Sequence, residues 1–156
     1  MAKSSLSTAS LPSSTSASTE TSFAAFLRES FDVLRAEMPD LHALMCQRLA
    51  PSRVELRVGD ELVGLAFSEN DVVFRLGAPR ANARSADIEV RTTRQTILEL
   101  VDAETTMLDS VTAETLFFGG ALGELARFYD GLMIYLHGAM RAPSFPNILR
   151  RFRHGQ

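Results

Sequence analysis

The sequence predicts an α+β domain in which helices cover one face of a five-stranded, mainly antiparallel sheet. From Phe23 to Leu34, apolar residues recur at three- and four-residue spacing, which is the period of an amphipathic helix. From Arg53 to Leu76 they alternate with polar residues, which is the period of a half-buried strand. The stretch 87–140 then runs strand, helix, helix, strand, helix. Strands and helices segregated in this way favour the α+β class over a repeated strand–helix–strand fold.

Length and composition bound the class of protein. The chain has 156 residues, which suits one domain, and 46% of them are apolar, which is ordinary for a soluble globule. No apolar run reaches the roughly 18 residues that a membrane span requires, so we expect no transmembrane segment. The net charge of −3 argues against nucleic acid as a partner, because nucleic-acid-binding domains usually carry a basic excess.

Cys46 is the single cysteine of the chain and lies in an apolar helical pattern. One cysteine excludes an intramolecular disulfide framework and a cysteine-based metal cluster. A reducing cytoplasm is therefore the expected location, with Cys46 as a small buried residue rather than a reactive thiol. We expect neither a metal nor an organic cofactor.

The two ends of the chain differ from its middle. Residues 1–21 are rich in Ser and Thr and have too little apolar surface to offset chain entropy, so they are predicted to be disordered. The folded domain is expected over residues 22–141. Residues 142–156 contain several arginines and no acidic residue, which predicts a solvated basic tail. Weak contact of this tail with an anionic membrane surface stays open as an alternative.

Two helices are predicted before the strands. The first runs from Ser22 to Met38 and is stopped by Pro39. Asp40 can cap the second helix, which carries its own apolar stripe and is stopped by Pro51. Both stripes need an apolar surface to pack on, and the strands that follow can provide it.

The clearest strand signal is a hairpin. Residues 53–58 and 61–67 alternate between polar and apolar, and the intervening Gly59-Asp60 fits a two-residue turn. This turn places Val58 opposite Glu61, and it fixes which side chains share a face. One face of the sheet is therefore predicted to be apolar and the other wet. The predicted apolar face comprises Val54, Leu56, Val58, Val63, Leu65, Phe67, Val72, Phe74, Leu76, Ile88 and Val90.

The remaining elements follow a loop. A strand at 87–91 leads into a helix whose start is marked by a capping box of Thr92 and Gln95. A short helix over 102–110 and a strand over 115–119 come next. The last helix, 122–140, has so broad an apolar face that we expect it to be mostly buried.

Four segments carry a resemblance to a known family. They are Asp87-Ile88-Glu89-Val90, Ile97-Leu98-Glu99-Leu100-Val101, Met107-Leu108 and Leu116-Phe117-Phe118-Gly119-Gly120-Ala121-Leu122. By pattern and order the chain resembles the sterol carrier protein type 2 family, in its bacterial branch, over residues 22–141. Ala103 and Glu114 depart from this pattern, because the family often has glycine there. The resemblance implies a mixed five-stranded sheet, helices on one face, and an apolar cavity for lipids between them.

Motifs for catalysis are missing from the sequence. It contains no Gly-x-Ser-x-Gly elbow, no His-Glu-x-x-His pair and no phosphate-binding loop. His137, Tyr129 and Tyr135 are able to act as an acid or base, but no carboxylate is visibly paired with any of them. His42 lies within a helix without an accompanying motif. We therefore predict that the protein is not an enzyme.

The sequence thus favours a non-catalytic carrier that holds a lipid or another apolar small molecule in an internal cavity. Burial of one methylene contributes about 0.8 kcal/mol, so an acyl chain needs no specific polar contact to bind. The expected ligand-binding residues are Phe74, Ile97, Leu98, Val101, Leu108, Phe118, Leu132 and Met133. Two alternatives stay open: a protein-interaction or accessory module whose cavity has collapsed, and an enzyme acting on an apolar metabolite. The sequence does not indicate the oligomeric state.

Overall fold

The structure, a computed structural model, describes residues 22–78, 81–82 and 84–155. The segment 1–21, for which the sequence predicts disorder, lies outside the described residues. In chain order the elements are α1 (Phe23–Glu37), α2 (Pro39–Leu49), β1 (Arg53–Val58), β2 (Glu61–Phe67), β3 (Val72–Leu76), β4 (Ile88–Thr92), α3 (Arg94–Val101), α4 (Met107–Thr112), β5 (Leu116–Gly120), α5 (Leu122–Arg141) and α6 (Phe145–His154).

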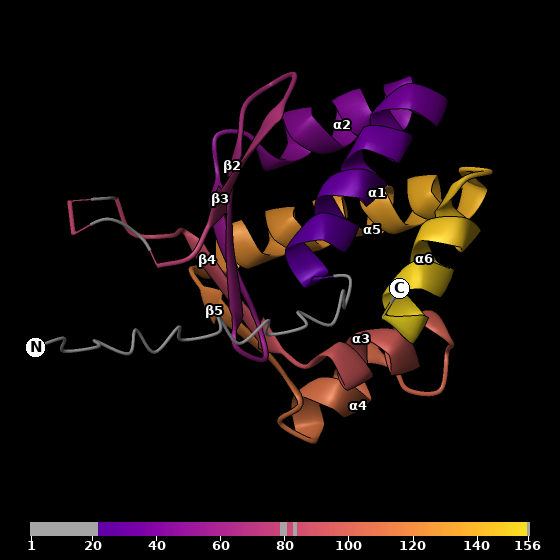
Figure 1. The fold of residues 1–156 in the computed structure, drawn as a ribbon. Coiled ribbons are helices and arrows are strands. Elements are labelled where there is room, and N and C mark those ends of the chain that lie inside the picture. Colours follow the sequence, from indigo (N-terminus) through magenta and orange to yellow (C-terminus); the bar gives the residue numbers. More distant parts are fainter. Residues whose placement is uncertain (1–21, 79–80, 83, 156) are drawn as a thin grey trace, which may run out of the picture.

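The sheet has five strands in the order β3-β2-β1-β4-β5, and helices α1, α2 and α5 lie on one side of it (Figure 1). β1 pairs with β4 in parallel, and the other pairs are antiparallel. The α+β class and the mainly antiparallel, five-stranded sheet are therefore confirmed. The predicted register of the hairpin is confirmed as well, since Val58 pairs with Glu61.

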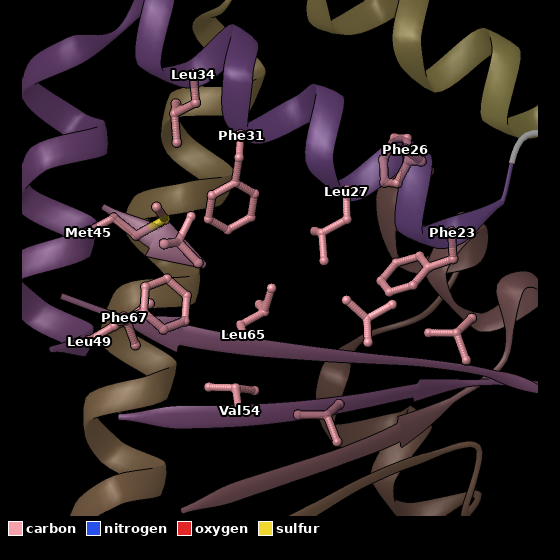
Figure 2. Packing of buried hydrophobic residues seen from close by; sticks show 14 of the residues in the cluster. Phe23, Phe26, Leu27, Phe31, Leu34, Met45, Leu49, Val54, Leu65 and Phe67 are labelled. Carbon is pink, nitrogen blue, oxygen red and sulfur yellow. The ribbon is translucent and has the colours of Figure 1, made fainter. Parts of the chain in front are cut away.

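The inner face of the sheet is apolar, as predicted from the alternation. Val54, Val63 and Ile88 are fully buried on it. Val54 and Leu65 of the sheet face apolar side chains of α1 and α2 (Figure 2). Leu76 is an exception, because β3 is an edge strand and 59% of this residue is exposed. The helices thus cover the middle of the sheet better than its β3 edge.

Carboxylates from distant parts of the chain cap helix N-termini. The Glu61 side chain accepts hydrogen bonds from the backbone N–H groups of Phe23 (2.8 Å) and Ala24 (3.2 Å), at the start of α1. Glu37, at the end of α1, likewise accepts from the backbone N–H of Ser144 (3.1 Å) just before α6. A negative charge at a helix N-terminus satisfies orphan donors and complements the helix dipole.

The C-terminal residues form helix α6, so the prediction of a solvated basic tail is wrong. Ile148 and Phe152 are buried, and the Phe152 ring stacks on Phe26 of α1 with centroids 4.3 Å apart. Two arginines of α6 form ion pairs with neighbouring elements: Arg151 with Glu29 of α1, and Arg153 with Asp102 at the end of α3. The apolar residues of α6 recur at helical spacing, but the surrounding arginines concealed this pattern in the composition.

Two details of the second half also differ from the prediction. The N-cap of α3 is Thr93, whose hydroxyl accepts a hydrogen bond from the backbone N–H of Thr96. The predicted capping box, which begins at Thr92, therefore starts one residue too early. Helix α5 is not mostly buried, because its only buried residues are Gly131, Gly138 and Ala139. Its broad apolar stripe therefore stays partly accessible.

Candidate functional site

Burial is unevenly distributed over the inner side of the sheet. The buried apolar cluster is built by α1, α2, α6 and strands β1 to β4, with Leu116 as the contribution of β5. Helices α3 and α4 bury Thr96 and Ser110 but no apolar residue. Apolar side chains that are only half-buried pack against the edge of this cluster, and on α3, α4, β5 and α5 they include Ile97, Leu98, Leu100, Met107, Phe118, Leu125, Phe128 and Ile134. We call this set the half-buried apolar region.

Most of the predicted ligand-binding residues fall in or beside this region. Ile97, Leu98 and Phe118 belong to it, and Leu132 and Met133 are half-buried on α5. Phe118 of β5 meets Phe128 of α5, with ring centroids 6.0 Å apart and the planes tilted by 55°. This pair of rings connects the β5 edge of the sheet to α5.

Three of the predicted residues lie elsewhere. Phe74 is on β3, at the opposite sheet edge from β5, where its ring meets Phe31 edge-on at 5.5 Å. Leu108 is 75% exposed on α4, and Val101 is 39% exposed at the end of α3. Phe74 is therefore separated from the half-buried apolar region, and Leu108 is largely on the surface.

Tyr135 is a half-buried residue of α5 whose hydroxyl points to α1. Its hydroxyl lies 2.7 Å from Ser30 Oγ, and Ser30 in turn donates its hydrogen to the Leu27 carbonyl. Because a serine has one hydroxyl hydrogen, Tyr135 must be the donor in the first bond. Burial raises the pKa of Tyr135 to about 12. Tyr135 therefore stays protonated, and its hydrogen bond ties α5 to α1.

His42 and Cys46 form a second buried pair, on adjacent turns of α2. The distance from Nε2 to Sγ is 3.9 Å. Desolvation, followed by the charge of Arg35, lowers the pKa of His42, and desolvation, followed by the charge of Asp71, raises the pKa of Cys46. A neutral imidazole beside a protonated thiol does not make an activated nucleophile. The i, i+4 spacing of the two residues was the sequence signal for this contact.

A hollow lies on the other, outer face of the sheet. It encloses about 630 Å³ beside strands β1, β2 and β3. Within the described ranges, no group of three or more His, Cys, Asp or Glu side chains is placed to hold a metal ion. The helices in those ranges include none that is long and apolar enough to cross a membrane.

Comparison with solved structures identifies the fold. The SCP2 domain of the ubiquinone synthesis protein UbiJ aligns with a TM-score of 0.56 at 17% identity, covering 75% of this chain and 91% of that one. Sterol carrier protein 2 from Yarrowia lipolytica aligns with a TM-score of 0.46 at 18% identity, covering 67% of this chain and 88% of that one. The likeness to the UbiJ domain shows that this chain has a sterol carrier protein 2-like fold.

A third structure is much larger than this chain. The sec-alkylsulfatase Pisa1 from Pseudomonas sp. aligns with a TM-score of 0.40 at 16% identity, and the aligned part covers 51% of this chain and 12% of the enzyme. This chain thus spans a small part of that enzyme's length. A scan of the sequence against protein-family models and a search of the curated proteins gave no match.

Proposed function

We propose that the protein binds and carries a lipid or another apolar small molecule, held between the inner face of β4 and β5 and helices α3, α4 and α5. The observation that carries this proposal is the half-buried apolar region. An ordinary core would bury such side chains, as Phe26, Leu34 and Met45 are buried on α1 and α2. Here they keep apolar surface that a ligand can cover.

Burial of apolar surface is enough to bind an acyl chain without a polar contact. An acyl chain of about 14 methylenes gains about 11 kcal/mol from burial at about 0.8 kcal/mol per methylene. Loss of translational and rotational freedom costs at least about 4 kcal/mol, which leaves a dissociation constant near the micromolar range. A domain of a ubiquinone synthesis protein has the same fold, which supports a role with an apolar molecule.

We further propose that the role is binding, not catalysis. The polar side chains with shifted pKa values are engaged with neighbouring polar groups: Tyr135 with Ser30, and His42 with Cys46. Their environments favour neutral forms, which suits a structural role better than proton transfer. A reducing, cytoplasmic location fits the single buried thiol of Cys46.

A protein-interaction role is the second candidate, and a different observation favours it. Leu108, Leu122 and Met140 are large apolar residues that are mostly exposed on α4 and α5. A partner or a second copy that covered them would gain apolar burial. In that case the half-buried apolar region would serve as an interface rather than as a ligand site.

Native mass spectrometry of freshly purified protein distinguishes these functions. We expect monomeric protein with an extra mass of a few hundred daltons, which organic extraction removes, and extracted protein should then bind a fluorescent fatty acid. Oligomeric protein without extra mass, which binds no fatty acid after extraction, would overturn the carrier proposal in favour of the interaction role.

A further inference from the structure

The outer hollow lies over a row of small side chains on β2. Alternation along β2 puts Val63 and Leu65 in the core, so Leu62, Gly64 and Ala66 face the outer side. All three of these outer residues line the hollow. Gly64 and Ala66 lack long side chains, which leaves a trough between the neighbouring strands. The volume of about 630 Å³ is within the range of small-molecule sites.

The strand register sets two arginines on opposite sides of this trough. Ala66 pairs with Arg53 of β1, and Gly64 pairs with Arg75 of β3. Both arginines line the hollow. Since neighbouring strands lie about 4.8 Å apart, long side chains from β1 and β3 can both reach a group seated over β2. Val73, which is exposed and pairs with Ala66, adds apolar surface beside Arg75.

The other charged groups of the hollow already have ionic partners. Glu55 is 3.9 Å from Arg57, and Glu89 is 3.1 Å from Arg91. Arg84, on the loop before β4, is 3.5 Å from Asp87. Within the part of the chain that the structure describes, Arg53 and Arg75 have no such ion pair. The trough therefore carries positive charge that the surrounding carboxylates do not neutralise.

We propose that this hollow is a second binding site, which takes a small anionic amphiphile. Arg53 and Arg75 hold its oxyanion group, a carboxylate or a phosphate, because guanidinium groups form charge-assisted hydrogen bonds with both. Leu62 and Val73 contact its apolar body, over the floor made by Gly64 and Ala66. The site is on the opposite face of the sheet from the half-buried apolar region, so it does not depend on the proposed carrier function.

The test uses the full chain and three probes with the same eight-carbon tail: octyl phosphate, octanoate and octanol. Calorimetric titration measures affinity, and NMR of the Leu and Val methyl groups locates each probe. We expect an anionic probe to bind and to shift the methyl signals of Leu62 and Val73. Octyl phosphate and octanoate separate a phosphate from a carboxylate preference, and the neutral octanol should leave these two signals unchanged.

Substitutions test which residues of the hollow bind the anion. Arg53→Gln and Arg75→Gln should each weaken anion binding about fivefold, as expected for one partly exposed ionic contact. Gly64→Leu should abolish it by filling the trough, and a Cβ at this position meets Arg75 Cβ at an ordinary 3.5 Å. Arg150→Gln is the control, because Arg150 is exposed on α6 and does not line the hollow. Circular dichroism confirms that each variant is folded.

Three results would overturn the proposal. One is that neither anion shifts the Leu62 and Val73 signals in the wild type. A second is that affinity in Arg53→Gln and Arg75→Gln equals that of Arg150→Gln. Since Phe118→Ala alters the inner face alone, loss of anion binding in that variant would also place the anion in the inner region and refute an outer site.

Discussion

Leu49 of α2 packs directly on the backbone of Gly131 in α5. A Cβ at Gly131 would lie 2.5 Å from both Cδ2 and Cγ of Leu49, closer than side chains approach each other. Leu49 itself is buried in the core, so it has little freedom to move away (Figure 2). The glycine thus permits the close approach of the two helices.

Gly131→Ala is therefore expected to destabilise the protein. Alanine favours a helix over glycine by about 1 kcal/mol, but overpacking a core costs about 1 to 3 kcal/mol. We expect a net loss of about 1 kcal/mol in urea unfolding. Gly123→Ala, in the same helix, is the control, since nothing lies within 4 Å of its added Cβ. Equal or higher stability of Gly131→Ala would contradict the packing described.

Phe152→Ala tests whether α6 belongs to the core. The ring is fully buried between helices, so its removal should cost about 3 to 5 kcal/mol of unfolding free energy. Arg150→Ala, on the exposed side of α6, should change the stability by less than about 0.5 kcal/mol. Similar stabilities for the two variants would restore the solvated-tail interpretation.

Phe118→Ala separates a ligand site from ordinary core. Because Phe118 is half-buried, we expect a loss of about 1 to 2 kcal/mol in ligand-free protein, together with weaker binding of a fluorescent fatty acid. Phe31→Ala, within the buried cluster, should cost about 3 to 5 kcal/mol. Unchanged fatty-acid affinity in a folded Phe118→Ala protein would remove Phe118 from the ligand site.

His42 should make stability depend on pH. Its pKa in the folded protein is lowered from 6.5, chiefly by burial, so below about pH 6.5 the unfolded chain binds a proton that the folded protein does not. Stability from His42 is thus complete above pH 6.5 and falls as the pH drops towards the folded pKa.

Urea unfolding at pH 7.5 and pH 5.5 measures this effect. The wild type should lose more stability between the two pH values than His42→Gln, in which the group is absent. His137→Gln, at an exposed site on α5, should behave as the wild type does. An identical pH dependence in the wild type and His42→Gln would show that His42 is not held in its neutral form.

The residues differ in how far the sequence alone determines their place. The turn at Gly59-Asp60 and the period of two fix the pairing of Val58 with Glu61, because both signals are local. The parallel pairing of β1 with β4 has no local signal, and it puts Phe74 at the far edge from Phe118. A pattern of apolar residues also does not say whether a partner covers them, so the burial of α5 was overestimated.

Because β1 is the central strand of the sheet, its position affects the order in which the strands fold and the order in which they unfold locally. β1 forms ladders with β2, its neighbour in sequence, and with β4, which follows only after β3 and a long loop. Pairing β1 with β4 closes a longer loop than pairing β1 with β2, and a longer loop costs more chain entropy. β1, β2 and β3 can therefore form an antiparallel meander before β4 and β5 join it. Native-state hydrogen exchange should then show the slowest amides on β1 and faster ones on β5, which opens together with the α3 and α4 segment.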